Sequence, residues 1–385
     1  MTGFNAATPF LAQYAQVLGV TASGDVEAWA GWFSAVFAAG MAISAPIWGV
    51  LADRVGHRII LLRALLGDAV TVGALALART PSQVLALRFM NGLVSGSVPA
   101  AYAMISMVTP FAERASALGL LQTSIFVGSS VGPTLGGVLA DTSGFRLTYV
   151  VSGLFLAIAG AVAWFGTRHH SHAHGSVQQA SLLAGVRTVM TSRALALLFV
   201  IRALITAGFR GVTTYMPLFV QSLSGPDSRV TTLTGVAFTV NMMTTALGSI
   251  GSGRMARRWS LRGLLTATAA GAALTFLCLA RVSDLRSLLW IQAVSGLLMG
   301  ALTTASVAAL SVAAPRDQVG AVFGLESTVQ SIANIAGPLA AAALAVAFGL
   351  RSVFVLAAML TAISAAFSWF GRSRTVAPES SEGNR

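Results

Sequence analysis

The sequence predicts an all-α membrane protein with twelve transmembrane helices, arranged as two pseudo-symmetric six-helix bundles. Of the 385 residues, 55% are apolar and only 9% are charged, whereas an ordinary soluble domain is about 25% charged. Apolar runs of the roughly 20 residues that a helix needs to cross the hydrocarbon core recur along the whole chain. The second half also repeats glycines, prolines and charges of the first half.

The apolar runs place the spans and the domain boundaries. They occur near 2–20, 29–52, 59–78, 83–108, 117–140, 147–166, 192–220, 231–253, 262–280, 287–312, 321–347 and 351–370. We therefore expect an N-terminal six-helix bundle (1–166), a cytoplasmic linker (167–191), a C-terminal six-helix bundle (192–370) and a cytoplasmic tail (371–385).

The first span is unusually short. Pro217 lies 25 residues after span seven begins near Ser192, whereas only eight residues precede the corresponding Pro9. Since a span needs about 20 residues, roughly half of the first helix is missing. We therefore expect a truncated first helix, with Met1 an internal methionine of a longer protein.

The arginines predict the orientation in the membrane. The net charge is +12, and all 24 basic residues are arginine. If the N-terminus is cytoplasmic, fifteen arginines fall on cytoplasmic loops and ends, six fall on the opposite side, and three lie inside spans: Arg88, Arg202 and Arg210. This asymmetry follows the positive-inside rule, so we expect both termini in the cytoplasm. It also accounts for the basic charge without a nucleic-acid partner.

Signatures of enzymes, cofactors and metal sites are missing from the sequence. No GxxxxGK[ST] motif, catalytic triad or metal-ligand constellation occurs, so we expect neither catalysis nor a cofactor. The RHHSHAH tract (168–174) lies in the linker, where a solvated stretch is favoured over a metal site. Cys278 is the single cysteine and cannot form an internal disulfide.

An internal repeat relates the two halves. An offset of 204 residues superimposes GVLADRVGHR (49–58) on GRMARRWSLR (253–262), and it carries Gly92 and Gly96 onto Gly296 and Gly300. An offset of 205 superimposes residues 117–140 on 322–345 without a gap. Two parallel halves with a substrate site between them near the bilayer midplane are typical of secondary transporters.

Three motifs of the first half carry a family resemblance. GVLADRVGHR resembles motif A of the major facilitator superfamily, and LALRFMNGLVSG (85–96) is similar to its motif B in span four. GSSVGPTLGG (128–137) matches motif C of span five, which in that superfamily is associated with antiporters. The first half resembles the drug:proton antiporter, or multidrug efflux, branch.

The resemblance implies a conformational latch on the cytoplasmic side. It would consist of Gly49, Asp53, Arg54, Gly56 and Arg58, with Asp53 facing the positive end of span eleven. Arg257 takes the place of Asp53 in the second half, so a single latch is expected. The alternative is that these basic residues only fix the topology.

Motif C has a mechanical interpretation. It comprises Gly128, Gly132, Pro133, Gly136 and Gly137. Small residues allow span five to pack closely against its neighbours, and the proline removes a backbone donor and bends the helix. A simple packing role is the alternative to a role in export.

Ionisable residues inside spans are functional candidates, because burying a charge in lipid is costly. We take Asp68, Arg88, Arg202 and Glu326 as candidates for proton coupling. By helical rise, Glu326 lies about 9 Å and Arg202 about 12 Å from the cytoplasmic face, so the two could form either a coupling pair or a static bridge. Asp68 either forms a fixed pair with Arg88 or carries the proton.

The polar residues of the spans predict the substrate cavity. The candidates are Asn5, Asn91, Ser95, Tyr102, Arg210, Asn241, Gln292, Gln330 and Asn334. Arg88, Asn91, Ser95 and Tyr102 fall on one face of span four, which lines the cavity in the superfamily. Three arginines against two acids make the cavity lean positive, which disfavours lipophilic cations and favours neutral or anionic amphiphiles.

These features predict a monomeric proton-coupled transporter that exports drug-like or small metabolite molecules from a bacterial inner membrane by alternating access. Its partners would be the substrate, protons and the lipid bilayer. A sugar or organic-acid importer or uniporter of the same fold is the first alternative. A membrane receptor or scaffold that transports nothing is the second.

Overall fold

The structure is a computed structural model that describes residues 2–167, 192–224, 229–255, 259–315 and 319–370. All regular structure within these ranges is helical. The helices are α1 (Thr2–Ala7), η1 (Thr8–Phe10), α2 (Leu11–Val17), α3 (Ser23–Val55), α4 (His57–Ala74), η2 (Leu75–Leu77), α5 (Pro81–Val94), α6 (Ser97–Val108), α7 (Phe111–Gly166), α9 (Arg193–Leu223), α10 (Val230–Met255), α11 (Leu261–Arg281), α12 (Leu285–Ala313), α13 (Val319–Phe348) and α14 (Arg351–Phe370).

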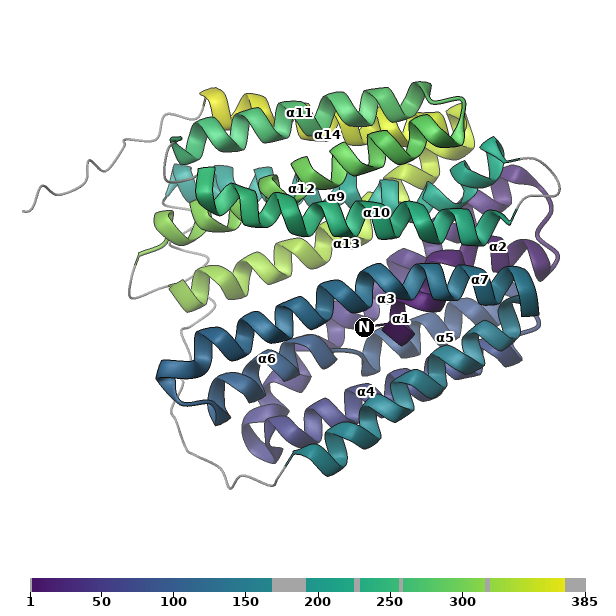
Figure 1. Cartoon of the computed structure of the whole chain (residues 1–385), viewed down its shortest axis with the longest axis horizontal. Helices are drawn as coiled ribbons and strands as arrows, with labels where there is room; N and C mark the ends of the chain where they lie inside the picture. The colour runs from purple at the N-terminus through teal and green to yellow at the C-terminus, as the bar shows by residue number, and fades with distance from the viewer. Residues whose placement is uncertain (1, 168–191, 225–228, 256–258, 316–318, 371–385) are drawn as a thin grey trace, which may run out of the picture.

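Ten helical segments in the described ranges are long and apolar enough to cross a membrane. One of them, Ala117–Gly166, has 50 residues. It contains a non-helical backbone at Gly144, where φ is 81°. A glycine reaches this conformation without a steric penalty. Beyond it the chain turns back and packs on α4, where a Cβ on Gly153 would lie 2.9 Å from the Ala69 carbonyl oxygen (Figure 1).

The helices form two groups along the chain. Elements up to α7 lie in one group, and α9 to α14 lie in the other (Figure 1). The groups contact each other mainly through α7 with α10 and through α3 with α13. The internal repeat relates α3 to α10 and the first part of α7 to α13. The α3–α13 and α10–α7 contacts are therefore equivalent to each other under the repeat.

Several local contacts recur at the repeat offset. Arg58 Nη2 donates to the Trp164 carbonyl oxygen (2.6 Å), and Arg262 Nε donates to that of Ser368 (2.9 Å). Each of these pairs ties the start of one helix to the end of another within its own half. The recurrence of both partners at one offset shows that the halves share tertiary contacts as well as sequence.

Helix N-caps recur in the same way. Thr80 caps α5 by accepting from the Gln83 backbone N–H, and Asp284 caps α12 by accepting from Ser287. These hydrogen bonds from Ser287 hold the pKa of the Asp284 carboxyl below its ordinary value. Spans four and ten therefore begin at equivalent positions.

Span four is interrupted, which corrects the expectation of a continuous helix over 83–108. The helix ends at Val94 and restarts at Ser97, with Gly96 at φ 125° between them. Neighbouring side chains donate hydrogen bonds to the carbonyl oxygens that the break leaves without a helical partner. The donors are Ser44 Oγ to Gly92 (3.3 Å), Trp48 Nε1 to Leu93 (2.7 Å) and Arg63 Nη2 to Ser95 (3.4 Å).

Hydrogen bonds between the two groups, as far as the described residues show, gather towards one end of the molecule. They include Gln13 with Pro217, Gln16 with Gln221, Glu27 with Tyr215, Ser34 with Thr214, Thr134 with Thr239, and Asp141 with Thr231 and Thr232. This end is opposite the end where Thr167 and Arg193 lie. In Figure 1 the groups meet at the right, whereas α7 and α13 diverge towards the left.

Candidate substrate and coupling site

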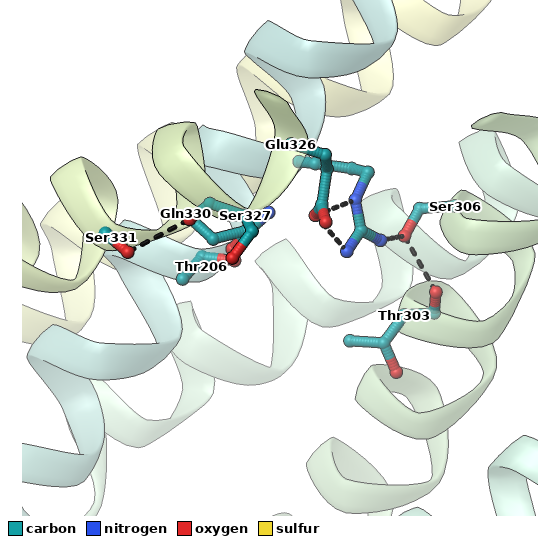
Figure 2. Close-up of polar contacts among 8 residues, drawn as sticks. Thr206, Thr303, Ser306, Glu326, Ser327, Gln330 and Ser331 are labelled. Carbon is teal, nitrogen blue, oxygen red and sulfur yellow. Dashed lines mark hydrogen bonds and ion pairs between the residues drawn. The ribbon is translucent and has the colours of Figure 1, made fainter. Parts of the chain in front are cut away.

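A ladder of polar side chains joins α9 to α13. Its rungs are Arg202 with Glu326, Thr206 with Gln330, and Arg210 with Asn334. Successive rungs are four residues apart on both helices, so each helix presents its polar side chains on one face. Figure 2 shows Glu326, Gln330 and Thr206 along this face, with Ser306 approaching from α12.

The first rung is an ion pair. Arg202 Nη2 and Nε lie 2.5 Å and 2.8 Å from Glu326 Oε1, and the two side chains are only 14% and 12% exposed. Arg202 Nη1 also donates to Ser306 Oγ at 2.7 Å, and Ser306 donates to the Thr303 carbonyl oxygen. The ion pair that we expected from the depths of the two residues is confirmed. Ser306 gives Arg202 an anchor that does not depend on Glu326.

The third rung lies one helical turn away from residues of α9 and α13 that contact the first half. Arg210 Nε donates to Asn334 Oδ1 at 2.8 Å, and Arg210 is exposed although it lies in the middle of α9. One turn further along α9, Thr214 contacts Ser34 of the first half at 3.2 Å. One turn further along α13, the Pro338 carbonyl oxygen lies 3.1 Å from a Cβ built on Gly31. The Arg210 rung therefore borders the space between the halves.

The first half has one counterpart of this ladder. Asn5 Nδ2 donates to Ser129 Oγ at 3.2 Å, with the sequence separation of 124 that also characterises the three rungs. At an offset of 205 this pair corresponds to Arg210 with Asn334, which corrects the offset of 208 implied by aligning Pro9 with Pro217. The α7 residues that correspond to Gln330 and Glu326 are Ile125 and Leu121, which are apolar. An ionisable rung on this pair of helices thus belongs to the second half.

Asp68 and Arg88 lie in a buried network inside the first half. Asn91 Nδ2 donates to Asp68 Oδ1 (2.8 Å), and Asn91 Oδ1 accepts from Arg88 Nη1 (3.0 Å). Ser95 Oγ donates to Asp68 Oδ2 at 3.3 Å. The direct Asp68–Arg88 ion pair that we expected as the static alternative is absent, because the Asn91 amide lies between the two groups.

The burial of this network corrects the expected cavity wall. Asp68, Arg88 and Asn91 are 2%, 5% and 0% exposed, and Arg88 lies over the Phe37 ring at 4.2 Å from its centroid. Arg88 and Asn91 therefore face the interior of the first half in this conformation. The break at Gly96 also places Tyr102 on a separate helix, where it hydrogen-bonds Gln122 of α7.

Asn241 and Gln292 are the second-half equivalents of Phe37 and Arg88. Asn241 Nδ2 donates to the carbonyl oxygen (3.1 Å) and to Oε1 (3.2 Å) of Gln292, and both residues are buried. Gln292 Nε2 contacts Met216 Sδ at 3.3 Å. We expected both side chains on the cavity wall, whereas in this structure they join α10 to α12.

Motif C brings α7 close to two neighbours. A Cβ on Gly136 would lie 1.6 Å from the Ala6 carbonyl oxygen of α1, and one on Gly137 would lie 2.2 Å from that of Thr231 on α10. A Cβ on Gly132 would meet the Thr2 carbonyl oxygen at 2.7 Å. Gly136 and Gly132 thus pack within the first half, and Gly137 packs against the second. Gly128 is buried on the same helix, and the Pro133 carbonyl faces Gly235 of α10.

The predicted latch is described only in part. Asp53 lies in α3 and Gly320 in α13, but the Asp53 side chain and the surroundings of Gly320 lie outside the described residues. Gly56 has φ 92° and forms the turn into α4, and Arg54 is exposed. A Cβ built on Gly49 would meet no atom of the described residues within 4 Å. Arg58 contacts Trp164 and Thr167 of its own half, which differs from a role across the halves.

Sequence reasoning missed two ionisable residues. Glu27 is 8% exposed, because α3 begins at Ser23 rather than near residue 29. Arg63 stacks on Trp48, 3.5 Å from the ring centroid, although it is one of the fifteen arginines that we counted on cytoplasmic loops and ends. The signal was its position inside the apolar run 59–78, where a long side chain can reach the interior.

The fold and the site together define a multi-pass membrane transporter built from two helical halves. The sequence model of the Major Facilitator Superfamily matches residues 1–291 and 229–385. The chain therefore belongs to the major facilitator superfamily, and it is a transporter rather than an enzyme.

Known proteins similar to this chain support the same class. Multidrug resistance protein MdtG of Dickeya zeae (strain Ech586) is 29% identical over 96% of this chain and 91% of its own. The protein of the same name from Escherichia coli O6:K15:H31 (strain 536 / UPEC) is 28% identical over 98% and 92%. The expected likeness to the multidrug efflux branch is confirmed by these relatives.

Solved structures share the fold. A variant of the nucleoside transporter NupG superimposes with a TM-score of 0.78 at 12% identity, covering 95% of this chain and 97% of its own. A bacterial homolog of the human lysosomal transporter Spinster, in an inward-facing and unoccupied conformation, gives 0.76 at 17% identity, covering 96% and 93%. At these identities the likeness concerns the fold alone.

Proposed function

We propose that the protein is a monomeric proton-coupled transporter that exports drug-like or small metabolite molecules from a bacterial inner membrane. The names of its relatives support the substrate class. The largely buried Arg202–Glu326 ion pair between α9 and α13 is the observation that supports proton coupling.

The proposal includes twelve spans in two halves, 1–166 and 192–370, with the linker 167–191 and the tail 371–385 in the cytoplasm. Splitting α7 at Gly144 gives one crossing beyond the ten candidate segments. The segment from α1 to α2, which packs against α7, supplies the other. The excess of arginines on the linker side supports the orientation.

Alternating access would occur by rocking of the halves. The hydrogen bonds between the halves gather at the end away from the linker, which is expected of a state open to the cytoplasm. Gly137 and Gly235 bring α7 and α10 into backbone contact, and Thr134 and Asp141 add side-chain hydrogen bonds to the same interface. Opening to the outside would separate these contacts, and motif A would then close the cytoplasmic side.

Glu326 can exchange its arginine for a proton. Protonation of the carboxylate would remove the charge that the Arg202 guanidinium binds, so proton uptake and the ion pair compete. Ser306 retains Arg202 when the carboxylate is protonated. A change in hydration at this rung, as the halves rock, would shift the balance between the two states. Asp68 is the second candidate, because its network is buried and its carboxylate accepts only from neutral groups.

The test is transport in proteoliposomes with an imposed pH gradient. The panel of probes consists of naphthalene compounds of different charge. Proteoliposomes in which the protein is oriented inside-out should accumulate one of these probes in the lumen when the lumen is acid. A protonophore and the substitution Glu326→Gln should each abolish this accumulation. Glu113→Gln, at an exposed position at the start of α7, is the matched control and should transport like the wild type.

Two outcomes contradict the proposal. Uptake that ignores the pH gradient indicates the uniporter alternative, and no movement of any probe indicates a receptor or scaffold. Full coupling in Glu326→Gln together with loss of coupling in Asp68→Asn would indicate that Asp68, and not Glu326, carries the proton.

A further inference from the structure

The three arginines that the sequence placed inside the spans differ in how their charge is compensated. Arg202 pairs directly with Glu326, and Arg88 connects to Asp68 through Asn91. Arg210 has only the neutral amide of Asn334 as a side-chain partner among the described residues. A cation inside the membrane without a counter-ion is costly, so Arg210 requires a functional explanation.

The position of Arg210 makes its guanidinium accessible from the space between the halves. Arg210 is exposed, and the residue one turn along the same face of α9, Thr214, contacts Ser34 of the first half. Residues four apart on a helix point in nearly the same direction. The Arg210 side chain therefore lies on the face of α9 that Thr214 turns towards the first half.

The geometry leaves the recognition end of the guanidinium available. Asn334 Oδ1 accepts from Nε, which orients the plane of the group. Of the five N–H donors of an arginine, the four on Nη1 and Nη2 take part in no hydrogen bond found within the described ranges. These donors form the planar fork that binds two oxygens of one oxyanion.

We propose that Arg210, oriented by Asn334, binds the oxyanion group of the transported molecule, so that the substrates are amphiphiles with a carboxylate, sulfonate or phosphonate group. This inference rests on the proposed function, because it assigns the substrate class of the same site. It gives Arg210 the counter-ion that the described part of the chain does not supply. The first half places Asn5 at the equivalent position, so the site is one-sided.

Binding to protein in nanodiscs of uncharged lipid tests the assignment. The probes share one ring system: naphthalene-2-sulfonate, 2-naphthol and a naphthyl trimethylammonium ion. The wild type should bind the sulfonate most tightly. Arg210→Gln should weaken sulfonate binding about tenfold or more, since a hydrogen bond to a charged group contributes roughly 1.5–3 kcal/mol, and should leave naphthol binding unchanged.

Three further variants make the experiment specific. Arg210→Lys should retain a preference for the sulfonate, because it keeps the charge without the fork. Asn334→Ala should weaken sulfonate binding less than Arg210→Gln does, because it removes only the orientation. Arg286→Gln, an exposed arginine in the first turn of α12, is the control and should bind like the wild type.

Two results overturn the inference: equal or tighter binding of the trimethylammonium probe by the wild type, or unchanged sulfonate affinity in Arg210→Gln at an unchanged unfolding temperature. Failure of the proposed function is distinguishable, because this readout needs neither transport nor a pH gradient. Selective sulfonate binding without gradient-driven uptake would contradict the proposed export function and would support the anion site at Arg210. Gradient-driven uptake of cations that is insensitive to Arg210→Gln would do the reverse.

Discussion

Spans four and ten begin at equivalent caps and carry equivalent glycines, yet one is broken and the other is continuous. Gly96 has φ 125° between α5 and α6, whereas α12 runs through Gly300 without interruption. The first half supplies Ser44, Trp48 and Arg63 to the freed carbonyls, and the second half has Gly248, Ser252 and Ala267 at those positions. A helix can break inside a membrane protein only where neighbours satisfy its backbone.

The halves also place their charges differently. The buried network of Asp68 and Arg88 in the first half is replaced by Ala272 and Gln292 in the second. Conversely, Glu326 of the second half corresponds to Leu121 of the first. The first half thus carries charge in a network around α4 and α5, whereas the second half carries an ion pair between α9 and α13. Duplication preserved the packing frame, and the polar chemistry diverged within it.

The largest effect should come from the buried network. Asp68→Ala leaves Asn91, Ser95 and a buried Arg88 without their acid, which should cost about 3–5 kcal/mol of unfolding free energy. Gln292→Ala, in the uncharged second half, should cost about 2 kcal/mol. Unfolding of the purified protein in detergent measures both. Asp68→Asn keeps the shape and should cost less than Asp68→Ala. Equal costs for Asp68→Ala and Gln292→Ala would contradict the distinction between the halves.

The next effect concerns packing at Gly136 and its equivalent, Ala341. Gly136→Ala should cost about 3 kcal/mol, because the new Cβ would lie 1.6 Å from the Ala6 carbonyl oxygen and α1 must move away. The reverse change, Ala341→Gly, should cost about 1 kcal/mol, mainly through backbone entropy. Melting temperatures in one detergent compare them. A harmless Gly136→Ala would show that α1 and α7 are not held at this spacing.

The membrane class, the repeat and the main helices could be predicted because they depend on composition and periodicity. The Arg202–Glu326 pair could be predicted as well, since two spacings along straight helices place both residues at one depth. The break at Gly96 could not, because it depends on donors from α3 and α4. The burial of Arg88, Asn241 and Gln292 could not either, since a polar face on a span signals avoidance of lipid and does not distinguish a cavity from a neighbouring helix.

A smaller effect distinguishes why spans four and ten need a glycine at the equivalent positions Gly96 and Gly300. Among the described residues, a Cβ at Gly96 would meet only Arg63 Nη2, at 4.0 Å, so the cost of a side chain lies in the backbone conformation. Gly96→Ala and Gly96→Leu should therefore each cost about 2 kcal/mol. At Gly300 a Cβ would lie 2.0 Å from the Thr245 carbonyl oxygen, so the cost should rise from alanine to leucine. The unfolding free energies of the four variants provide the test. A rise with size at position 96 would mean that the space beside it is filled.

The smallest effect concerns Arg58 and Arg262, which make the same contact in each half. Arg58→Ala and Arg262→Ala each remove a hydrogen bond to a carbonyl oxygen at the end of a neighbouring helix, and each should cost about 1 kcal/mol. Arg58→Ala should cost slightly more, because Arg58 Nε also donates to Thr167 Oγ1 at 2.9 Å and the guanidinium lies 5.5 Å from the centre of the Trp164 ring. If Arg58 only joins α4 to the end of α7, both variants should retain their transport rate once folded. Loss of transport in Arg58→Ala at near-normal stability, with Arg262→Ala active, would instead return Arg58 to a latch between the halves, because the fold contact is common to both arginines and the latch was predicted for the first half alone.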